Sequence, residues 1–169
     1  MHTMEIWVGK NYQTSKNKIL VLGESWYGQE VSIAEYISKW AAREIKDTTF
    51  SRIFNAGSGS HTSKATESEL LDFWHTIVFY NYVVGTVGET RSHRPTKMQY
   101  EFSESSLNLI LKQFAPDGVW VLGKEQSHYS VPVIESLCLP YEVVAHPTSF
   151  GLKAKVLQNS WRTILEKTA

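Results

Sequence analysis

The chain has 169 residues, 42% of them hydrophobic and 20% charged, which fits a single globular domain over residues 1–169. Its 17 basic residues balance 17 acidic ones, which excludes a strongly basic, polyanion-binding protein and leaves only a local patch for any nucleic-acid contact. No apolar run approaches the roughly 18 residues of a membrane span, so we expect no membrane partner.

The first half of the chain predicts one strand followed by two helices. An apolar run ending in glycine, residues 18–23, is typical of a buried strand. Apolar residues at helical spacing predict an amphipathic helix over 31–45. The small and polar residues 54–66 predict a loop, and Thr66 is a suitable N-cap for a second helix over 67–80.

The second half continues the alternation of strands and helices. Its expected elements are a turn-rich loop (85–97), a helix from Ser103 to just before Pro116, a strand (118–123), a helix in the segment QSHYSVPVIESL (126–137), a strand (141–149) and a helix (151–167). This pattern predicts a three-layer α/β/α fold with a central, mostly parallel four-stranded sheet.

Cys138 is the only cysteine in the chain. It excludes an internal disulfide and a cysteine-based metal site, and it fits a reducing cytoplasm. No general base lies nearby in sequence, so we expect Cys138 to be a small core residue in a cytoplasmic monomer.

Polar and aromatic residues follow each of the three predicted strands, in the segments GESWYG, GKEQSHY and AHPTSFG. Ligands of parallel sheets bind beyond the carboxyl ends of the strands, so these segments are expected to converge. Trp26 and Tyr27 are expected to be exposed beside Glu24, where they would wall a slot for a flat, hydrogen-bonding ring such as a nucleobase.

Glu24 and Ser25 come directly after the first strand. A carboxylate there could act as a general base, steer a water molecule or stabilise a developing cation. It could equally cap the next helix or pair with a nearby cation.

His146 ends the third strand and can donate to a developing oxyanion, although a structural role is as compatible with the sequence. Thr148 and Ser149 follow it, at an expected helix start that could hold a phosphate or serve as an ordinary N-cap.

Asn81 offers one acceptor and two donors and could read the edge of a pyrimidine, or it could close a turn at a helix end. Phe79, beside it, could stack on a base. Arg91, Arg94 and Lys97 form a basic cluster that could contact phosphates or be a solvated loop. Metal-ligand spacings and cofactor motifs are absent from the sequence, so we expect neither a metal nor a cofactor.

Three of these segments together resemble the uracil-DNA glycosylase superfamily, over about residues 18–165. GESWYG is similar to the family's first motif, G-Q-D-P-Y or G-E-A-P-G, and HPTSFG is similar to its last motif, H-P-S-P. FYNYV is similar to the middle segment that supplies an asparagine. Ser25 stands where the best-known branch has an aspartate, Trp26 replaces a proline, and the second proline of the last motif is missing.

The resemblance implies a role for each matching residue. Glu24 falls where some branches have an acid, and Ser25 at the position of the water-activating aspartate. Tyr27 would shape the pocket and Asn81 would read the base. His146 would stabilise the departing base.

By the same resemblance, Thr148 and Ser149 would grip the DNA backbone. The function expected is hydrolysis of the N-glycosidic bond of a deaminated base, either uracil or hypoxanthine and xanthine, in single- or double-stranded DNA. A nucleobase- or nucleotide-binding module of the same fold, without the chemistry, is the alternative.

Overall fold

A single mixed sheet organises the computed structural model, which describes residues 6–28, 31–90 and 92–169. In the described part the strands are β1 (Trp7–Val8), β2 (Ile19–Gly23), β3 (Val78–Asn81), β4 (Gly118–Leu122) and β5 (Tyr141–Val144). Their order in space is β1-β3-β2-β4-β5; the last four are parallel, and β1 is antiparallel to β3. The prediction of four strands was wrong because the two residues of β1 are too few to show an alternating pattern.

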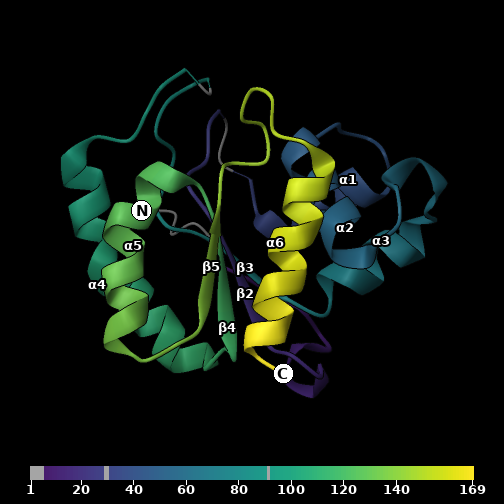
Figure 1. The fold of residues 1–169 in the computed structure, drawn as a ribbon. Coiled ribbons are helices and arrows are strands. Elements are labelled where there is room, and N and C mark those ends of the chain that lie inside the picture. Colours follow the sequence, from purple (N-terminus) through teal and green to yellow (C-terminus); the bar gives the residue numbers. More distant parts are fainter. Residues whose placement is uncertain (1–5, 29–30, 91) are drawn as a thin grey trace.

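Helices cover both faces of the sheet (Figure 1). They are α1 (Ile33–Ala41), α2 (Thr48–Ser58), α3 (Glu67–Trp74), α4 (Lys97–Phe114), α5 (Lys124–Ser136) and α6 (Ala154–Lys167), with short 3₁₀ turns η1 (Tyr12–Thr14) and η2 (Thr62–Lys64). Ile19 and Val21 of β2 pack toward α1, α2, α3 and α6, whereas Leu20 and Leu22 pack toward α4 and α5. The three-layer α/β/α prediction is therefore confirmed.

The predicted helix over 67–80 is a helix followed by a strand. It begins as expected, with Thr66 and Glu69 forming a capping box, but it ends at Trp74. Residues 78–81 form β3 instead, which pairs in parallel with β2 from Leu20 to Gly23. A short apolar run of aromatic and β-branched residues is compatible with the residue spacing of a helix and with that of a strand. Here the pairing with a buried neighbouring strand makes it a strand.

Several predicted boundaries also differ from the structure. The expected loop over 54–66 begins inside α2, whose N-cap Asp47 accepts a hydrogen bond from the amide of Phe50. Strand β5 ends at Val144 rather than at 149, and the last helix begins at Ala154 rather than at 151. Helix α1 is shorter than the predicted 31–45, and α4 begins before the expected Ser103, at Lys97.

Cys138 is exposed rather than buried, so its predicted core position was wrong. It has a positive φ of 54°, in the turn that follows α5 and leads the chain back to the sheet. Its apolar neighbours in sequence therefore do not carry it into the core. In the described part of the chain, no helix has both the length and the apolarity needed to cross a membrane.

Phe50, near the start of α2, is the centre of an aromatic cluster on one face of the sheet. Its ring lies 4.6–6.1 Å, centroid to centroid, from five other rings. These belong to Trp26, Tyr36, Trp40, Trp74 and Phe79. Edge-to-face packing of this kind adds to the free energy of area burial and fixes the position of α2 against β3.

We expect Phe50→Ala to lower the free energy of unfolding by about 3–5 kcal/mol, because it removes a buried ring with many partners. Phe102→Ala is the matched control, since the Phe102 side chain is 74% exposed, and should change stability by less than about 0.5 kcal/mol. Urea unfolding of both variants measures the difference. Equal losses in the two variants would contradict the central position of Phe50.

Candidate functional site

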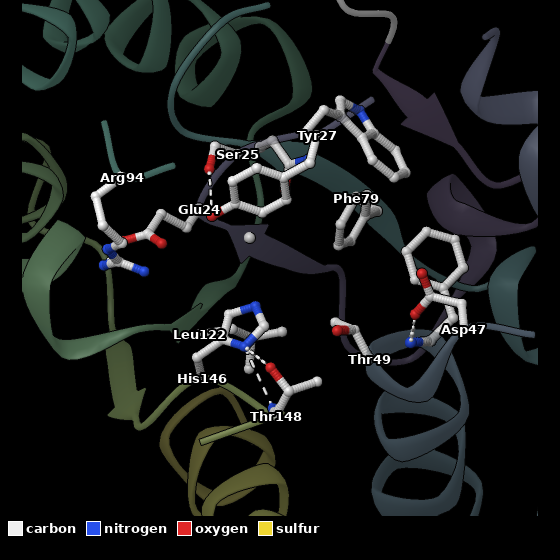
Figure 2. A pocket seen from close by; sticks show the side chains of 14 residues that line it. Glu24, Ser25, Tyr27, Asp47, Thr49, Phe79, Arg94, Leu122, His146 and Thr148 are labelled. Carbon is white, nitrogen blue, oxygen red and sulfur yellow. Dashed lines mark hydrogen bonds and ion pairs between the residues drawn. The ribbon is translucent and has the colours of Figure 1, made fainter. Parts of the chain in front are cut away.

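A pocket of about 190 Å³ opens at the carboxyl ends of the parallel strands (Figure 2). Residues that follow or end β2, β3, β4 and β5 line it together with the first turn of α2. They include Glu24, Ser25, Trp26, Tyr27, Asp47, Thr49, Phe50, Phe79, Asn81, Arg94, Leu122, His146 and Thr148. The pocket lies where β2 is flanked by β3 on one side and β4 on the other, which is the usual ligand position in an open α/β sheet.

The carboxyl ends of β2 and β4 are joined by Gln126 of α5. Its side-chain Nε2 donates to the carbonyl oxygens of Leu22 and Leu122, at 3.1 Å in each case. Gln126 is fully buried, so these bonds are shielded from water. The floor of the pocket is thereby fixed between two strands that are remote in sequence.

Gly23 and Asn81 face each other where β2 and β3 end, as paired residues of the parallel ladder. A Cβ atom at residue 23 would lie only 2.1 Å from Oδ1 of Asn81. Any larger residue here would therefore require the Asn81 amide to move. Asn81 is 6% exposed, and its side chain lines the pocket from the end of a strand, not from a turn after a helix.

Tyr27 and His146 face each other across the pocket (Figure 2). The Ser25 hydroxyl lies 3.3 Å from the Tyr27 hydroxyl and donates to it, which holds the tyrosine ring over the opening. Tyr27 and Trp26 were expected to be exposed, but both are partly buried. The indole of Trp26 packs edge-on against Tyr36, with ring centroids 5.0 Å apart, and so forms part of the wall.

The turn after β5 determines which nitrogen of His146 can carry a proton. The amide N–H of Thr148 donates to Nδ1 of His146 at 3.2 Å, and the Thr148 hydroxyl lies 2.9 Å from the same atom. Because a backbone amide can only donate, Nδ1 is the acceptor and the proton of the neutral ring is on Nε2. The ring of His146 projects into the pocket (Figure 2), so this tautomer makes His146 a hydrogen-bond donor there.

Thr148 and Ser149 do not lie at a helix start, because α6 begins only at Ala154. Their amides are used within the turn: that of Thr148 by His146 Nδ1, and that of Ser149 by the His146 carbonyl at 2.8 Å. The predicted helix start at these residues was therefore wrong, whereas their contact with a DNA phosphate stays a prediction. Ser149 lines a neighbouring hollow rather than the pocket itself.

Arg52 of α2 holds this turn in place and was missed by the sequence analysis. Its guanidinium donates to the carbonyl oxygens of Pro147 and Leu152, which lie at the two ends of the loop. A planar guanidinium can bridge two acceptors in this way with a fixed geometry. Arg52 is thus a positioning residue for the loop that carries His146.

Glu24 is buried, with 5% of its surface exposed. Its Oε1 atom accepts hydrogen bonds from Arg94 at 2.8 Å and from the Tyr100 hydroxyl at 2.7 Å. The sequence left open that Glu24 pairs with a nearby cation, and in the structure it pairs with Arg94. A buried carboxylate requires such partners, because an unpaired charge is costly at this depth.

Arg94 also donates to Glu125, so one guanidinium joins two carboxylates. Partial desolvation lowers the pKa of Arg94, but the hydrogen bond to Glu125 and the charge of Glu24 outweigh it, and the pKa is raised overall. Lys97 pairs with Glu101 along α4 at 3.5 Å. Arg91 lies outside the described residues. The two described members of the predicted basic cluster, Arg94 and Lys97, are therefore paired with acids.

Phe79 is 2% exposed and contributes only part of its ring to the pocket wall, since it also packs against Phe50 and Trp74. Asp47 and Thr49 line the pocket as well but were missed by the sequence analysis, because the residues before 54 were assigned to no element. The sequence DTTF, an N-cap residue followed by Phe50, was a usable signal for the start of α2.

Within residues 6–28, 31–90 and 92–169, no group of three His, Cys, Asp or Glu side chains is arranged to hold a metal ion. A comparison with protein-family models gives no match. A comparison with curated proteins finds no significantly similar sequence.

Gly23→Ala tests the close approach to Asn81. We expect it to lower the free energy of unfolding by about 1–3 kcal/mol, because the new methyl group would overlap Oδ1. Combined with Asn81→Ala, the same substitution should cost much less, and the coupling in this double-mutant cycle should be about 0.5–3 kcal/mol. Urea unfolding of the two single variants and the double variant provides the measurement. Additive costs would show that the amide does not occupy this space.

Tyr100→Phe tests the hydrogen bond to the buried carboxylate and should cost about 1–3 kcal/mol at neutral pH. Burial raises the pKa of Tyr100, and the hydrogen bond to Glu24 raises it further. Above about pH 10 the unfolded chain therefore loses a phenolic proton that the folded chain keeps, and stability falls. The variant should lose less stability than the wild type between about pH 9 and pH 11, as measured by urea unfolding; parallel curves would contradict this.

Proposed function

We propose that this chain is a DNA glycosylase that hydrolyses the N-glycosidic bond of a deaminated base. The observation that carries the proposal is the convergence of Tyr27, Asn81 and His146, with Glu24 beside them, around one small pocket. Glu24 and Tyr27 follow β2, whereas Asn81 ends β3 and His146 follows β5, so their meeting is a property of the fold. Their chemistry is suited to a flat ring with carbonyl and N–H groups at its edge.

The size of the pocket supports a single flipped base as ligand. A cavity of about 150 Å³ can hold one benzene ring, and the pocket here measures about 190 Å³. This favours uracil over the two-ring bases hypoxanthine and xanthine. Tyr27 and Phe79 supply aromatic walls, and Asn81 supplies an amide that can pair with the O4 and N3–H edge of uracil.

Departure of the base is the step that His146 assists. The bond between C1′ of the sugar and N1 of uracil breaks, and its electron pair remains on the base as an anion delocalised onto O2. The Nε2–H of His146 donates to that oxygen. Water then adds its oxygen to C1′ and releases a proton to the solvent, the base anion takes up a proton from the solvent, and the products are the free base and an abasic sugar. A donor preorganised for an oxyanion is worth about 10²–10³ in rate.

Glu24 acts as a fixed negative charge that favours the oxocarbenium-like sugar. Its Oε1 is already bonded to Arg94 and Tyr100, so it is positioned rather than mobile. Ser25 has no carboxylate and donates to Tyr27, which assigns it to shaping the pocket. The proposed catalysis therefore depends more on the leaving group than on activation of water.

Phe150 supports a contact with DNA beside the pocket. It is fully exposed, four residues after His146, on the loop that Arg52 holds. Apolar side chains of this kind are inserted between base steps by proteins that distort DNA, and flipping a base requires such distortion. We propose that the chain acts on DNA as a monomer in the cytoplasm.

A nucleobase- or nucleotide-binding module without catalysis is the second candidate. Two observations favour it: Ser25 stands where a catalytic carboxylate would be expected, and Arg94 compensates the charge of Glu24. Both candidates use the same pocket and the same contacts to the base. They differ only in whether the glycosidic bond is cleaved.

The deciding experiment incubates the protein with single strands and duplexes that contain uracil, hypoxanthine or xanthine, followed by alkaline cleavage of abasic sites. We expect strand breaks at uracil, and a loss of about 10²–10³-fold in rate in His146→Ala, because the donor to the leaving base is removed. His128→Ala, which changes an exposed histidine on α5, is the control and should retain the wild-type rate. Binding of free uracil without any breaks would favour the second candidate.

A further inference from the structure

A second hollow, of about 480 Å³, adjoins the pocket along the first turn of α2. Asp47 lines both. The other residues that line the second hollow come from the end of α1 and the residues after it, from α2, from the loop before α3 and from α3. They include Arg43, Lys46, Thr48, Ser51, Arg52, Asn55, His61 and Thr62.

Three cations, Arg43, Lys46 and Arg52, converge on this hollow. Within the described part of the chain, none of the three forms an ion pair with a carboxylate. Arg43 donates instead to the carbonyl oxygens of Thr62 and Ala65, at 2.9 and 2.7 Å. The guanidinium is thus held in place while its charge is not neutralised.

Arg52 is held in the same manner, by the carbonyl oxygens of Pro147 and Leu152. Asp47 is the one acid lining the hollow in the described part of the chain, and its oxygens accept from the Tyr36 hydroxyl at 2.7 Å and the Phe50 amide at 2.8 Å. Three positive charges therefore face one carboxylate that already has two donors. This local excess of positive charge attracts an anion.

We propose that this hollow binds a phosphate group of the nucleotide strand whose base occupies the pocket. Guanidinium and ammonium groups together with a hydroxyl, here that of Thr48, are the usual phosphate donors. The choice of phosphate over another anion rests on the proposed function, because a base pocket and an adjoining cationic hollow match the two parts of a nucleotide. Arg94 and Lys97, by contrast, are each paired with carboxylates.

The test uses Lys46→Glu in the full chain, because Lys46 is exposed. Lys112→Glu is the matched control, since it makes the same charge change on α4, across the sheet from α2. Inorganic phosphate is titrated into isotope-labelled protein while amide signals are recorded. We expect signals of residues 46–52 to shift in the wild type and in Lys112→Glu, but not in Lys46→Glu.

The second measurement is the affinity for single-stranded oligothymidine and for thymidine 5′-monophosphate at several salt concentrations. Lys46→Glu should bind the oligonucleotide about tenfold more weakly. In a plot of the logarithm of the binding constant against the logarithm of the salt concentration, its slope should be smaller by about 0.7, the value for one phosphate contact with a single strand. If binding depends on Lys46 and is tighter for the oligonucleotide than for the mononucleotide, the bound group is a backbone phosphate. Equal Lys46-dependent binding would identify the terminal phosphate of a nucleotide.

The absence of phosphate-induced shifts, or equal weakening by Lys46→Glu and Lys112→Glu, would overturn this inference. Its failure can be distinguished from that of the proposed function. Phosphate-induced shifts in a protein that excises no base would refute the glycosylase and leave the phosphate site standing. Excision at the wild-type rate by Lys46→Glu, without phosphate-induced shifts, would refute the phosphate site alone.

Discussion

The close approach of Gly23 and Asn81 is the constraint on which the site depends. The side-chain amide of Asn81 lies so near residue 23 that a Cβ atom there would overlap it. The two residues are paired at the ends of two parallel strands. A buried amide at the floor of a pocket has few ways to satisfy its polar atoms, and a ligand with a complementary edge is one of them. The other groups of the pocket are arranged around this point.

Charge is distributed unevenly around the pocket. On one side, Glu24 and Glu125 share Arg94, and Tyr100 adds a second donor to Glu24. On the other side, Arg43 and Arg52 are held by carbonyl oxygens and form no ion pair with a carboxylate of the described residues. In the proposed function, Glu24 beside the sugar and a phosphate on the opposite side would together orient a nucleotide in one direction across the sheet edge.

Several residues hold the pocket-lining residues in place. Arg52 bridges the loop after β5, and the amide of Thr148 sets the tautomer of His146. Gln126 joins the strands under the pocket. For the proposed function such contacts matter, because a donor to the leaving base must be held close to its productive geometry before the substrate binds.

The sequence by itself determined the α/β class and the strand ends that carry Glu24, Tyr27 and His146, because an apolar run that stops at a glycine or a polar turn is visible locally. It could not assign β3, since the run 77–84 fits a helix or a strand until β2 is beside it. The burial of Trp26, the pairing of Glu24 with Arg94 and the place of α2 in the pocket wall were decided only by the tertiary structure. These are contacts between segments distant in sequence, and local patterns of residues carry no information about them.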